Sequence, residues 1–349
     1  ATFKNKKCCY LLLFTCILKL QVFDWLYSHA HFLNREKTSE KVKRMVDGCK
    51  FITIFALPTS LEKMLTRTYR RIKSPLNYIG GKTKILDQIL PLFPKYINNF
   101  VDIFAGGCNV GINVEANKIY FNDNLSFLIE MYRYFQQNEL ESTLSYIQNR
   151  IVTLGLSLTN EEAYKKLRNA YNQHKHPLDL FVLIAYSFNH QIRFNNNHQF
   201  NNPFGKNRSS FNPSMKHNLE QFIIQIKETQ PIFSSLCFTD FDYSFLTQDD
   251  FLYADPPYLI TTGTYNDGKR GFKGWNEKTE HQLLTLLDQL NARGIKFALS
   301  NVLEHKGKEN TILKSWLSTR PHYVVNHINI HYANANYQTL VRNKNASDE

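Results

Sequence analysis

Cysteine is scarce in this chain of 349 residues, and the spacing of its cysteines fits neither a disulfide framework nor a zinc site. There is no Cys-x-x-Cys pair and no zinc-like spacing with histidine among the six cysteines, which are Cys8, Cys9, Cys16, Cys49, Cys108 and Cys237. Such usage is typical of a reduced intracellular protein with buried thiols. We therefore predict a protein without a metal centre.

An uninterrupted hydrophobic run long enough to cross a membrane is also missing. The apolar stretch at residues 8–27 follows three lysines, as in a signal peptide. However, Lys19, Gln21 and Asp24 interrupt it before it reaches about 20 residues, and no small-residue cleavage site follows. We predict a cytoplasmic protein with no membrane partner. Residues 1–73 are interpreted as an N-terminal extension of unknown role, with Met64 close to the natural start.

Acidic residues are few in two parts of the chain. The net charge is +12, and residues 1–74 hold 15 Lys and Arg against 5 Asp and Glu. The remainder is nearly neutral, with 27 against 25. Within it, residues 165–216 hold eight basic residues and one acid, Asp179. A local basic patch is the electrostatic footprint of a polyanion-binding surface, so we expect this segment to contact nucleic acid.

Strand-like and helix-like segments alternate from residue 74 on, which predicts an α/β fold with a parallel sheet. Residues 125–235 interrupt this alternation and are interpreted as an inserted, mostly helical subdomain. The predicted strands lie at residues 99–107, 118–124, 234–242, 250–258, 295–301 and 322–330.

The dinucleotide fingerprint G-x-G-x-x-G is absent, and a different glycine turn stands in its place. The segment DIFAGGCNVG puts Asp102 at a predicted strand end, followed by Gly106 and Gly107. Asp123 lies 21 residues later at the end of the next strand, the offset of an acid that binds ribose hydroxyls. Glycines allow a ligand to approach the backbone closely. The pattern favours a nucleoside ligand without pyrophosphate over NAD. It therefore disfavours a nicotinamide-dependent dehydrogenase. The alternative is a tight strand-to-helix turn with a solvated acid and no ligand.

A second glycine pair lies upstream, in PLNYIGGKTK at residues 75–84. Tyr78 precedes Gly80, Gly81 and Lys82, which begin a helical segment. This arrangement can place a lysine and an aromatic ring over a bound carboxylate or purine. The alternative is a helix start with a surface lysine.

The segment FLYADPPY ends a predicted buried strand in an acid, two prolines and a tyrosine. The exocyclic amine of a nucleobase is a poor nucleophile because its lone pair is delocalised into the ring. Asp255 and the carbonyl of Pro256 can accept its hydrogens, since the bond to Pro257 restricts the local backbone. Tyr258 offers a face for stacking. A base in a duplex reaches such a site only when it is flipped out. The alternative is a proline turn after an edge strand.

The ordered segments PLNYIGGK, DIFAGG, FNDN and DPPY resemble the Dam-type N6-adenine DNA methyltransferases, which belong to the alpha-ordered amino-methyltransferases. The resemblance covers residues 74–349 and implies a Rossmann-like methyltransferase sheet, with residues 125–235 as an inserted target-recognition subdomain. It implies site-specific methylation of the N6 amine of a flipped-out adenine, with Asp255, Pro256, Pro257 and Tyr258 as the catalytic residues. Other amines (cytosine N4, RNA adenine or protein glutamine) and a catalytically silent nucleic-acid-binding protein are the alternatives.

The resemblance also implies the cofactor S-adenosylmethionine. Asp123 would hold its ribose, Lys82 would neutralise its carboxylate or support the site, and Asp255 would serve both its amino end and the target amine. The implied cofactor-binding residues are Tyr78, Gly80, Gly81, Lys82, Asp102, Phe104, Gly106, Gly107, Asp123, Asp240, Phe241 and Asp255.

Residues 187–208 resemble the hairpin with which this family enters double-stranded DNA. The implied DNA-binding residues are Arg193, Asn195, Asn201, Lys206 and Arg208, with Arg193 on a guanine edge, asparagines on adenine edges and the last two on phosphates. Phe194, Phe200 and Phe204 are either wedges or hairpin packing. The segment 261–275 resembles a loop that closes over the flipped base, and a cognate restriction endonuclease acting independently is an expected partner.

Overall fold

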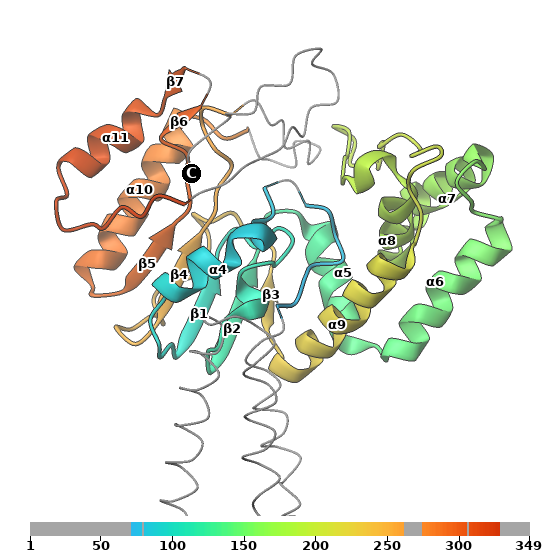
Figure 1. The fold of residues 1–349 in the computed structure, drawn as a ribbon, viewed down its shortest axis with the longest axis horizontal. Helices are drawn as coiled ribbons and strands as arrows, with labels where there is room; N and C mark the ends of the chain where they lie inside the picture. Colours follow the sequence, from blue (N-terminus) through green and yellow to red (C-terminus); the bar gives the residue numbers. More distant parts are fainter. Residues whose placement is uncertain (1–70, 79, 262–273, 306, 329–349) are drawn as a thin grey trace, which may run out of the picture. The chain divides into compact units, whose positions relative to one another are not determined.

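The computed structural model describes residues 71–78, 80–261, 274–305 and 307–328 (Figure 1). The segment 1–70, most of the predicted closing loop and the chain end from residue 329 lie outside these residues. Among the helices described, none is long and apolar enough to cross a membrane.

A parallel sheet of five strands forms the centre of the part shown in colour in Figure 1, which confirms the predicted α/β class. Its strands lie in the order β3-β2-β1-β4-β5, and every neighbouring pair is parallel. The direction of winding reverses between β1 and β4, and in open α/β sheets ligands bind beyond the carboxyl ends of the strands at such a switch point. The strand bounds are β1 Asn99–Asp102, β2 Lys118–Asn122, β3 Ile232–Ser234, β4 Phe251–Ala254 and β5 Lys296–Leu299.

Both faces of the sheet are buried, because successive side chains of a strand point to opposite sides. Phe100 and Phe251 face the cluster that includes the inserted helices. Val101 and Leu252 face the cluster that includes α10 (Glu277–Ala292) and α11 (Thr311–Ser318). The central strands therefore read as nearly continuous apolar runs, and the switch point is fixed between two cores.

Five helices lie between β2 and β3 in the chain: α5 (Ser126–Gln137), α6 (Leu140–Leu154), α7 (Glu161–His174), α8 (Pro177–Tyr186) and α9 (Pro213–Thr229). All residues of α8 from Leu178 to Tyr186 are buried, as expected of a helix that is apolar all round. Helices α5, α6 and α7 pack around it, and α5 also contacts β3 (Figure 1). The helical insertion thus has a core continuous with one face of the sheet.

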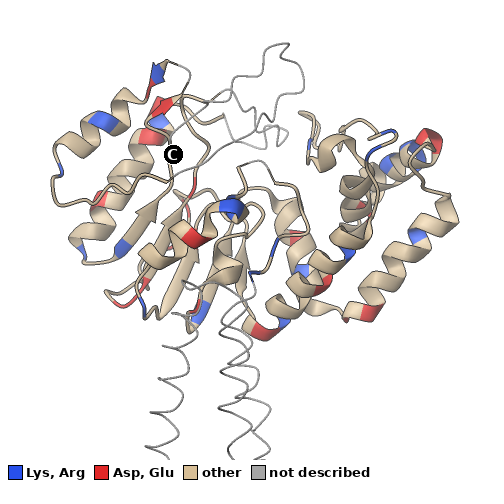
Figure 2. Ribbon diagram, viewed as in Figure 1, with Lys and Arg blue, Asp and Glu red and all other residues tan. Residues whose placement is uncertain are grey.

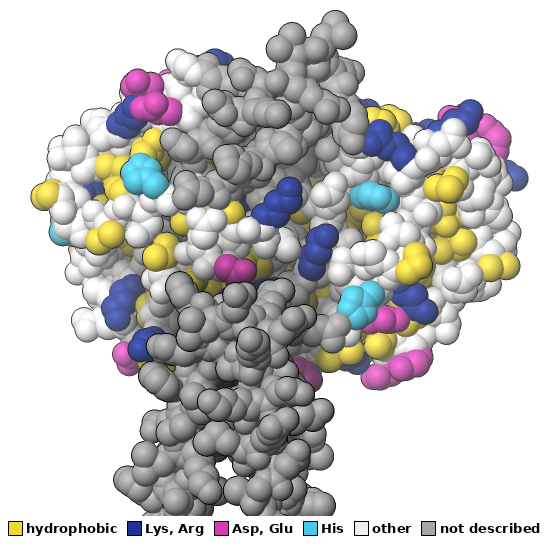
Figure 3. Space-filling view, viewed as in Figure 1, with side chains coloured by type: hydrophobic (Ala, Val, Ile, Leu, Met, Phe, Trp, Pro, Cys, Tyr) yellow, Lys and Arg dark blue, Asp and Glu magenta, His cyan; other side chains and the backbone are white. Residues whose placement is uncertain are grey.

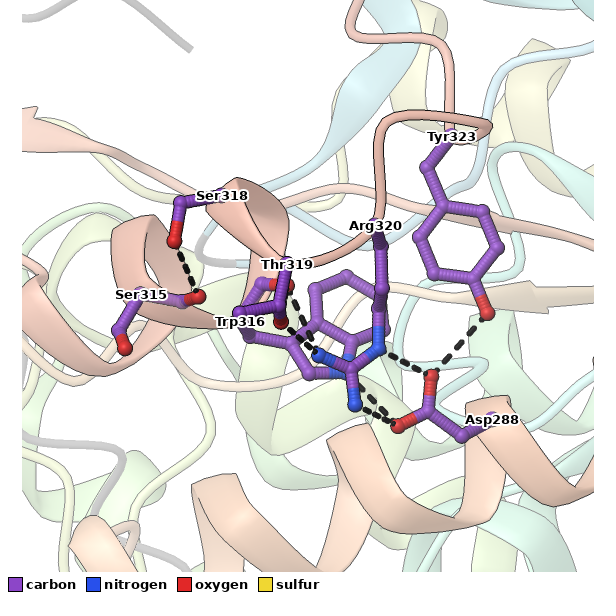
Figure 4. A network of polar contacts seen from close by, with 7 residues as sticks. All are labelled: Asp288, Ser315, Trp316, Ser318, Thr319, Arg320 and Tyr323. Carbon is purple, nitrogen blue, oxygen red and sulfur yellow. Dashed lines mark hydrogen bonds and ion pairs between the residues drawn. The ribbon is translucent and has the colours of Figure 1, made fainter.

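On the opposite face, a polar network ties α11 and the chain after it to α10 (Figure 4). The carboxylate of Asp288 accepts hydrogen bonds from the indole of Trp316, from the phenol of Tyr323 and from the guanidinium of Arg320. Arg320 also lies over the Trp316 ring, 5.1 Å from its centroid. These contacts hold the last described helix against α10.

Two strand predictions are wrong. Residues 322–328 of the predicted strand 322–330 form no strand, and Tyr323 instead bonds to Asp288 of α10. The other predicted strand is wrong in position. The strand β3 ends at Ser234, so the predicted strand over residues 234–242 does not form. The side chain of Asn122 explains the early end, because its amide accepts from the Leu236 N–H (3.1 Å) and donates to the Leu236 carbonyl (3.0 Å). These bonds replace the strand ladder, and the chain turns at Cys237–Asp240.

Candidate active site

A cavity opens beyond the carboxyl ends of the strands. Its empty volume, counted together with the open solvent at its mouth, is about 930 Å³. The sequence-predicted residues that line it are Tyr78, Gly80, Gly81, Lys82, Asp102, Phe104, Gly106, Gly107, Asp123, Asp255 and Pro257. The structure therefore brings residues from four separate motifs to one place.

The glycine turn after β1 is shaped by close packing against Tyr78. Gly106 has φ +46°, and a Cβ atom there would lie 2.7 Å from Cε1 of the Tyr78 ring. The Gly106 carbonyl accepts a hydrogen bond from the buried Tyr132 hydroxyl at 2.7 Å. Both the left-handed backbone and the ring contact require glycine at this position.

Asp123 holds this turn in place from the end of β2. Its Oδ2 accepts from the Gly106 N–H and its Oδ1 from the Leu125 N–H, each at 2.9 Å. A carboxylate has about four lone-pair sites, so these bonds leave capacity for a ligand hydroxyl. The ribose-binding role of Asp123 stays a prediction, while its bonds to the glycine turn are an additional structural role.

Asp102 is a buried acid on the cavity wall, with 2% of its surface exposed. Within the described residues, no group donates a hydrogen bond to its Oδ1. Burial, followed by the nearby Asp255 carboxylate, raises the pKa of Asp102 well above its usual value. A buried acceptor without a donor costs free energy, so a ligand N–H or O–H at this atom would be stabilising.

Lys82, Asp255 and Tyr258 form a compact polar cluster at the cavity. Lys82 is only 2% exposed, and its Nζ lies 3.0 Å from Asp255 Oδ1. The same Nζ donates to the Tyr258 hydroxyl at 2.6 Å and to the Gly80 carbonyl at 2.9 Å. The Tyr258 hydroxyl in turn donates to Asp255 Oδ1 at 3.0 Å. A buried ammonium requires such partners, so the cluster fixes the orientation of the Asp255 carboxylate.

The apolar part of the lining includes residues that sequence reasoning missed. Leu236, Cys237 and Phe238 line the cavity, whereas Asp240 and Phe241 do not. Because β3 ends early, the residues that follow the strand end are 236–238. Asp240 is exposed, and Phe241 is buried in the core against Tyr243. Placing the end of β3 at Ser234 would have been enough to predict Leu236, Cys237 and Phe238 as lining residues.

Asn109 is a further lining residue that sequence reasoning missed. Its Oδ1 accepts from the Thr83 hydroxyl at 2.7 Å and from the Ser74 N–H at 3.2 Å. It therefore joins the first motif to the glycine turn. The sequence offered only its place directly after that turn as a signal.

The predicted DNA-entering hairpin is present as two antiparallel bridges, Ser187↔Phe204 and Phe194↔Phe200. Phe194 and Phe200 are buried and belong to the helical core, with the Phe194 ring stacked on Phe127. Phe204 is half-buried against Tyr164. These phenylalanines therefore serve hairpin packing.

Three of the predicted DNA-binding side chains bond within the hairpin. Arg193 donates from Nε to the Asn201 side chain at 2.8 Å and from Nη2 to the Asn201 carbonyl at 3.2 Å. The Asn195 side chain accepts from the N–H groups of Asn197 and Gln199. In this structure these three side chains stabilise the hairpin through hydrogen bonds within it.

Lys206 and Arg208 are exposed, and the Arg208 guanidinium lies 4.8 Å from the centroid of the Phe188 ring. The base of the hairpin touches the cavity loop, because Asn77, next to Tyr78, donates to the Asn189 carbonyl at 3.0 Å. The basic residues of segment 165–216 lie on α7, α9 and the hairpin (Figure 2). On the face in Figure 3, Lys and Arg side chains are scattered among acidic, histidine and apolar ones. Hairpin and cavity thus adjoin through the Asn77–Asn189 contact.

Comparison with known proteins identifies the family to which this chain is similar. The sequence pattern of the "D12 class N6 adenine-specific DNA methyltransferase" matches residues 78–338. The chain is 52% identical over 279 residues to "Modification methylase StsI" of Streptococcus sanguinis, and 50% identical over 273 residues to "Type II methyltransferase M.FokI" of Planomicrobium okeanokoites. These matches cover 80% and 78% of this chain, and 42% of the length of each relative. A "DNA adenine methylase" of Escherichia coli is 25% identical over 232 residues, covering 65% of this chain and 79% of the relative.

Proposed function

This chain belongs to the D12 class of N6 adenine-specific DNA methyltransferases, and from that premise we propose that it methylates the N6 amine of an adenine flipped out of double-stranded DNA. It spans only 42% of the length of the StsI and M.FokI methylases, so the activity is proposed for this chain itself. The observation that carries the proposal is the cluster of Lys82, Asp255 and Tyr258 at the cavity of the switch point.

Membership of this family implies a methyl donor, and we infer that the donor is S-adenosylmethionine. When bound, it supplies an electrophilic methyl group. The cavity fits this molecule because its lining combines an acceptor in need of a donor, Asp102 Oδ1, with the aromatic side chains Phe104 and Phe238. Asp102 would accept from its amino or hydroxyl groups, Asp123 would accept from its ribose, and the two phenylalanines would contact its purine.

The residues of this chain have separate tasks in the proposed reaction. Asp255 accepts one N–H of the target amine and the Pro256 carbonyl accepts the other, which directs the nitrogen lone pair towards the methyl group. Lys82 holds the Asp255 carboxylate and also the Tyr258 hydroxyl. Tyr258 stacks on the flipped base. After methyl transfer the product amine loses its proton to solvent, so Asp255 stays ionised throughout.

The hairpin beside the cavity is the proposed reader of the DNA site, within an insertion that we propose as the target-recognition subdomain. We place Lys206 and Arg208 on phosphates, which fix position without carrying sequence information. We further propose that the protein acts in the cytoplasm alongside an independently acting restriction endonuclease. The names of the relatives, "modification methylase" and "type II methyltransferase", support that pairing.

The test is to incubate the purified chain with radiolabelled S-adenosylmethionine and a DNA library, and to map the methylated positions. The proposal expects N6-methyladenine within one short sequence. Asp249→Ala, which replaces an exposed acid close to β4, serves as the matched control for Asp255→Ala. Label in cytosine, in RNA or in protein would point to another amine, and label in none of these would indicate a silent binding protein.

A further inference from the structure

Three aromatic rings meet beside the cavity, and only two of them line it. The rings of Phe104 and Phe238 lie 5.5 Å apart between centroids, and both residues line the cavity. The Trp275 ring lies 5.6 Å from Phe104 in an edge-on arrangement and 5.8 Å from Phe238. Trp275 is not among the lining residues. It therefore supports the aromatic wall from behind.

A fully buried carboxylate fixes the Trp275 indole. Glu280, on the first turns of α10, has 0% of its surface exposed, and its Oε2 accepts the Trp275 indole N–H. Its Oε1 accepts from the side-chain amides of Asn301 and Asn310, each at 3.1 Å. Burying a carboxylate is costly unless it is hydrogen-bonded, and hydrogen bonds to an ionised acceptor are the stronger kind. Glu280 thus ties Trp275 to α10, to the end of β5 and to the start of α11.

The same helix carries a second pair of this type away from the cavity. Asp288 of α10 accepts the Trp316 indole N–H at 3.1 Å (Figure 4). The Trp316 ring contacts Phe297 and Tyr323, and none of these residues lines the cavity. Within the part of the chain that the structure describes, α10 therefore carries two tryptophan–carboxylate pairs, of which one touches the cavity wall.

We propose that Trp275 and Glu280 are positioning residues for the cofactor. Glu280 fixes Trp275, and the Trp275 ring fixes Phe104 and Phe238 in the orientation that contacts the purine of the cofactor. The inference rests on the proposed function, because it takes S-adenosylmethionine as the ligand of the cavity. Asp288 and Trp316 have the same chemistry and no such role.

The first experiment measures the response of the parent sequence and uses variants only to assign its resonances. The chain contains three tryptophans, so protein labelled with 5-fluorotryptophan gives three fluorine resonances, each assigned from a Trp→Phe variant. S-adenosylhomocysteine is then titrated while its binding is followed by calorimetry. The Trp275 resonance should shift in proportion to the bound fraction, and the Trp316 resonance should stay in place.

The second experiment compares the two pairs by substitution. Glu280→Gln keeps the size of the side chain and removes its charge, and should weaken S-adenosylhomocysteine binding about tenfold, equivalent to about 1.4 kcal/mol. Trp275→Leu should weaken it at least as much. Asp288→Asn, the matched control, should leave the affinity unchanged at any temperature where the protein is folded.

Two results would overturn the inference. One is a Trp275 resonance that stays unmoved when S-adenosylhomocysteine is bound, which remains decisive if the Glu280 variant does not fold. The other is equal affinity of folded Glu280→Gln, Asp288→Asn and parent protein. Absence of any binding to the parent is a separate result, because it overturns the cofactor assignment and this inference with it.

Discussion

The cavity at the switch point and the hairpin of the helical insertion differ in what their polar side chains do. In the cavity, Lys82 and Asp255 line the space where a ligand fits and bond to each other and to Tyr258. In the hairpin, Arg193 bonds to Asn201, and these bonds shape the hairpin itself. The proposed catalytic centre is therefore built by contacts within the protein. We expect the side chains that read DNA to depend on DNA for their final partners.

The largest effect should come from Asp255→Ala. Loss of the accepting carboxylate should reduce methyl transfer about 10²–10³-fold or more, the loss typical of removing one preorganised polar partner of a transition state. The measurement is single-turnover transfer of labelled methyl to DNA, with circular dichroism to verify folding. Unaltered transfer by this variant would show that the cavity cluster is not the catalytic centre.

Lys82→Met should have the next largest effect, and it distinguishes the two roles predicted for this lysine. Because the Lys82 ammonium holds Asp255 and Tyr258, kcat should fall about 10–100-fold while the Kd of S-adenosylhomocysteine changes little. Lys84→Met, on the same short helix, is the control. A raised Kd with an unchanged kcat at saturation would instead assign Lys82 to the cofactor carboxylate.

Arg193→Ala tests the hairpin side of the comparison. If Arg193 exchanges Asn201 for a guanine edge on binding, its loss should reduce discrimination at one base pair by about 1–3 kcal/mol and leave cofactor affinity intact. Asn201→Ala removes the side-chain acceptor of the Arg193–Asn201 hydrogen bond and leaves Arg193 in place. Equal behaviour of both variants at every base pair would mean that the pair only shapes the hairpin.

The smallest expected effect concerns stability and the buried Asp102. The pKa of Asp102 is raised in the folded protein. As pH rises, the unfolded state therefore loses the Asp102 proton at a lower pH than the folded state does. The resulting loss of stability grows as pH rises from the unfolded pKa to the folded pKa. Asp102→Asn should therefore raise the melting temperature relative to the parent more at pH 8 than at pH 4, while weakening cofactor binding. Parallel pH curves for the two proteins would contradict the raised pKa.

The sequence correctly predicted which motifs come together at the cavity where each motif lies at the end of a buried strand. Asp102 ends β1 and Asp255 directly follows β4, and because these two strands are parallel neighbours, the two acids lie at the same edge of the sheet. Prediction from sequence failed at Asp240 and Phe241 because the bonds from Asn122 to Leu236 end β3 early, and no local pattern signals that contact. Glu280 and Trp275 were missed for a similar reason, since a buried acid on an amphipathic helix looks like any exposed one in the sequence.

The central claim is that the clustered Asp255 carboxylate serves the amine of adenine in DNA. The most direct measurement is nucleoside mass spectrometry of duplex DNA after incubation with the chain and S-adenosylmethionine. N6-methyldeoxyadenosine should form with the parent protein and with Asp249→Ala, and should be lost with Asp255→Ala. Methylation confined to cytosine, or N6-methyldeoxyadenosine formed equally by all three proteins, would contradict the claim.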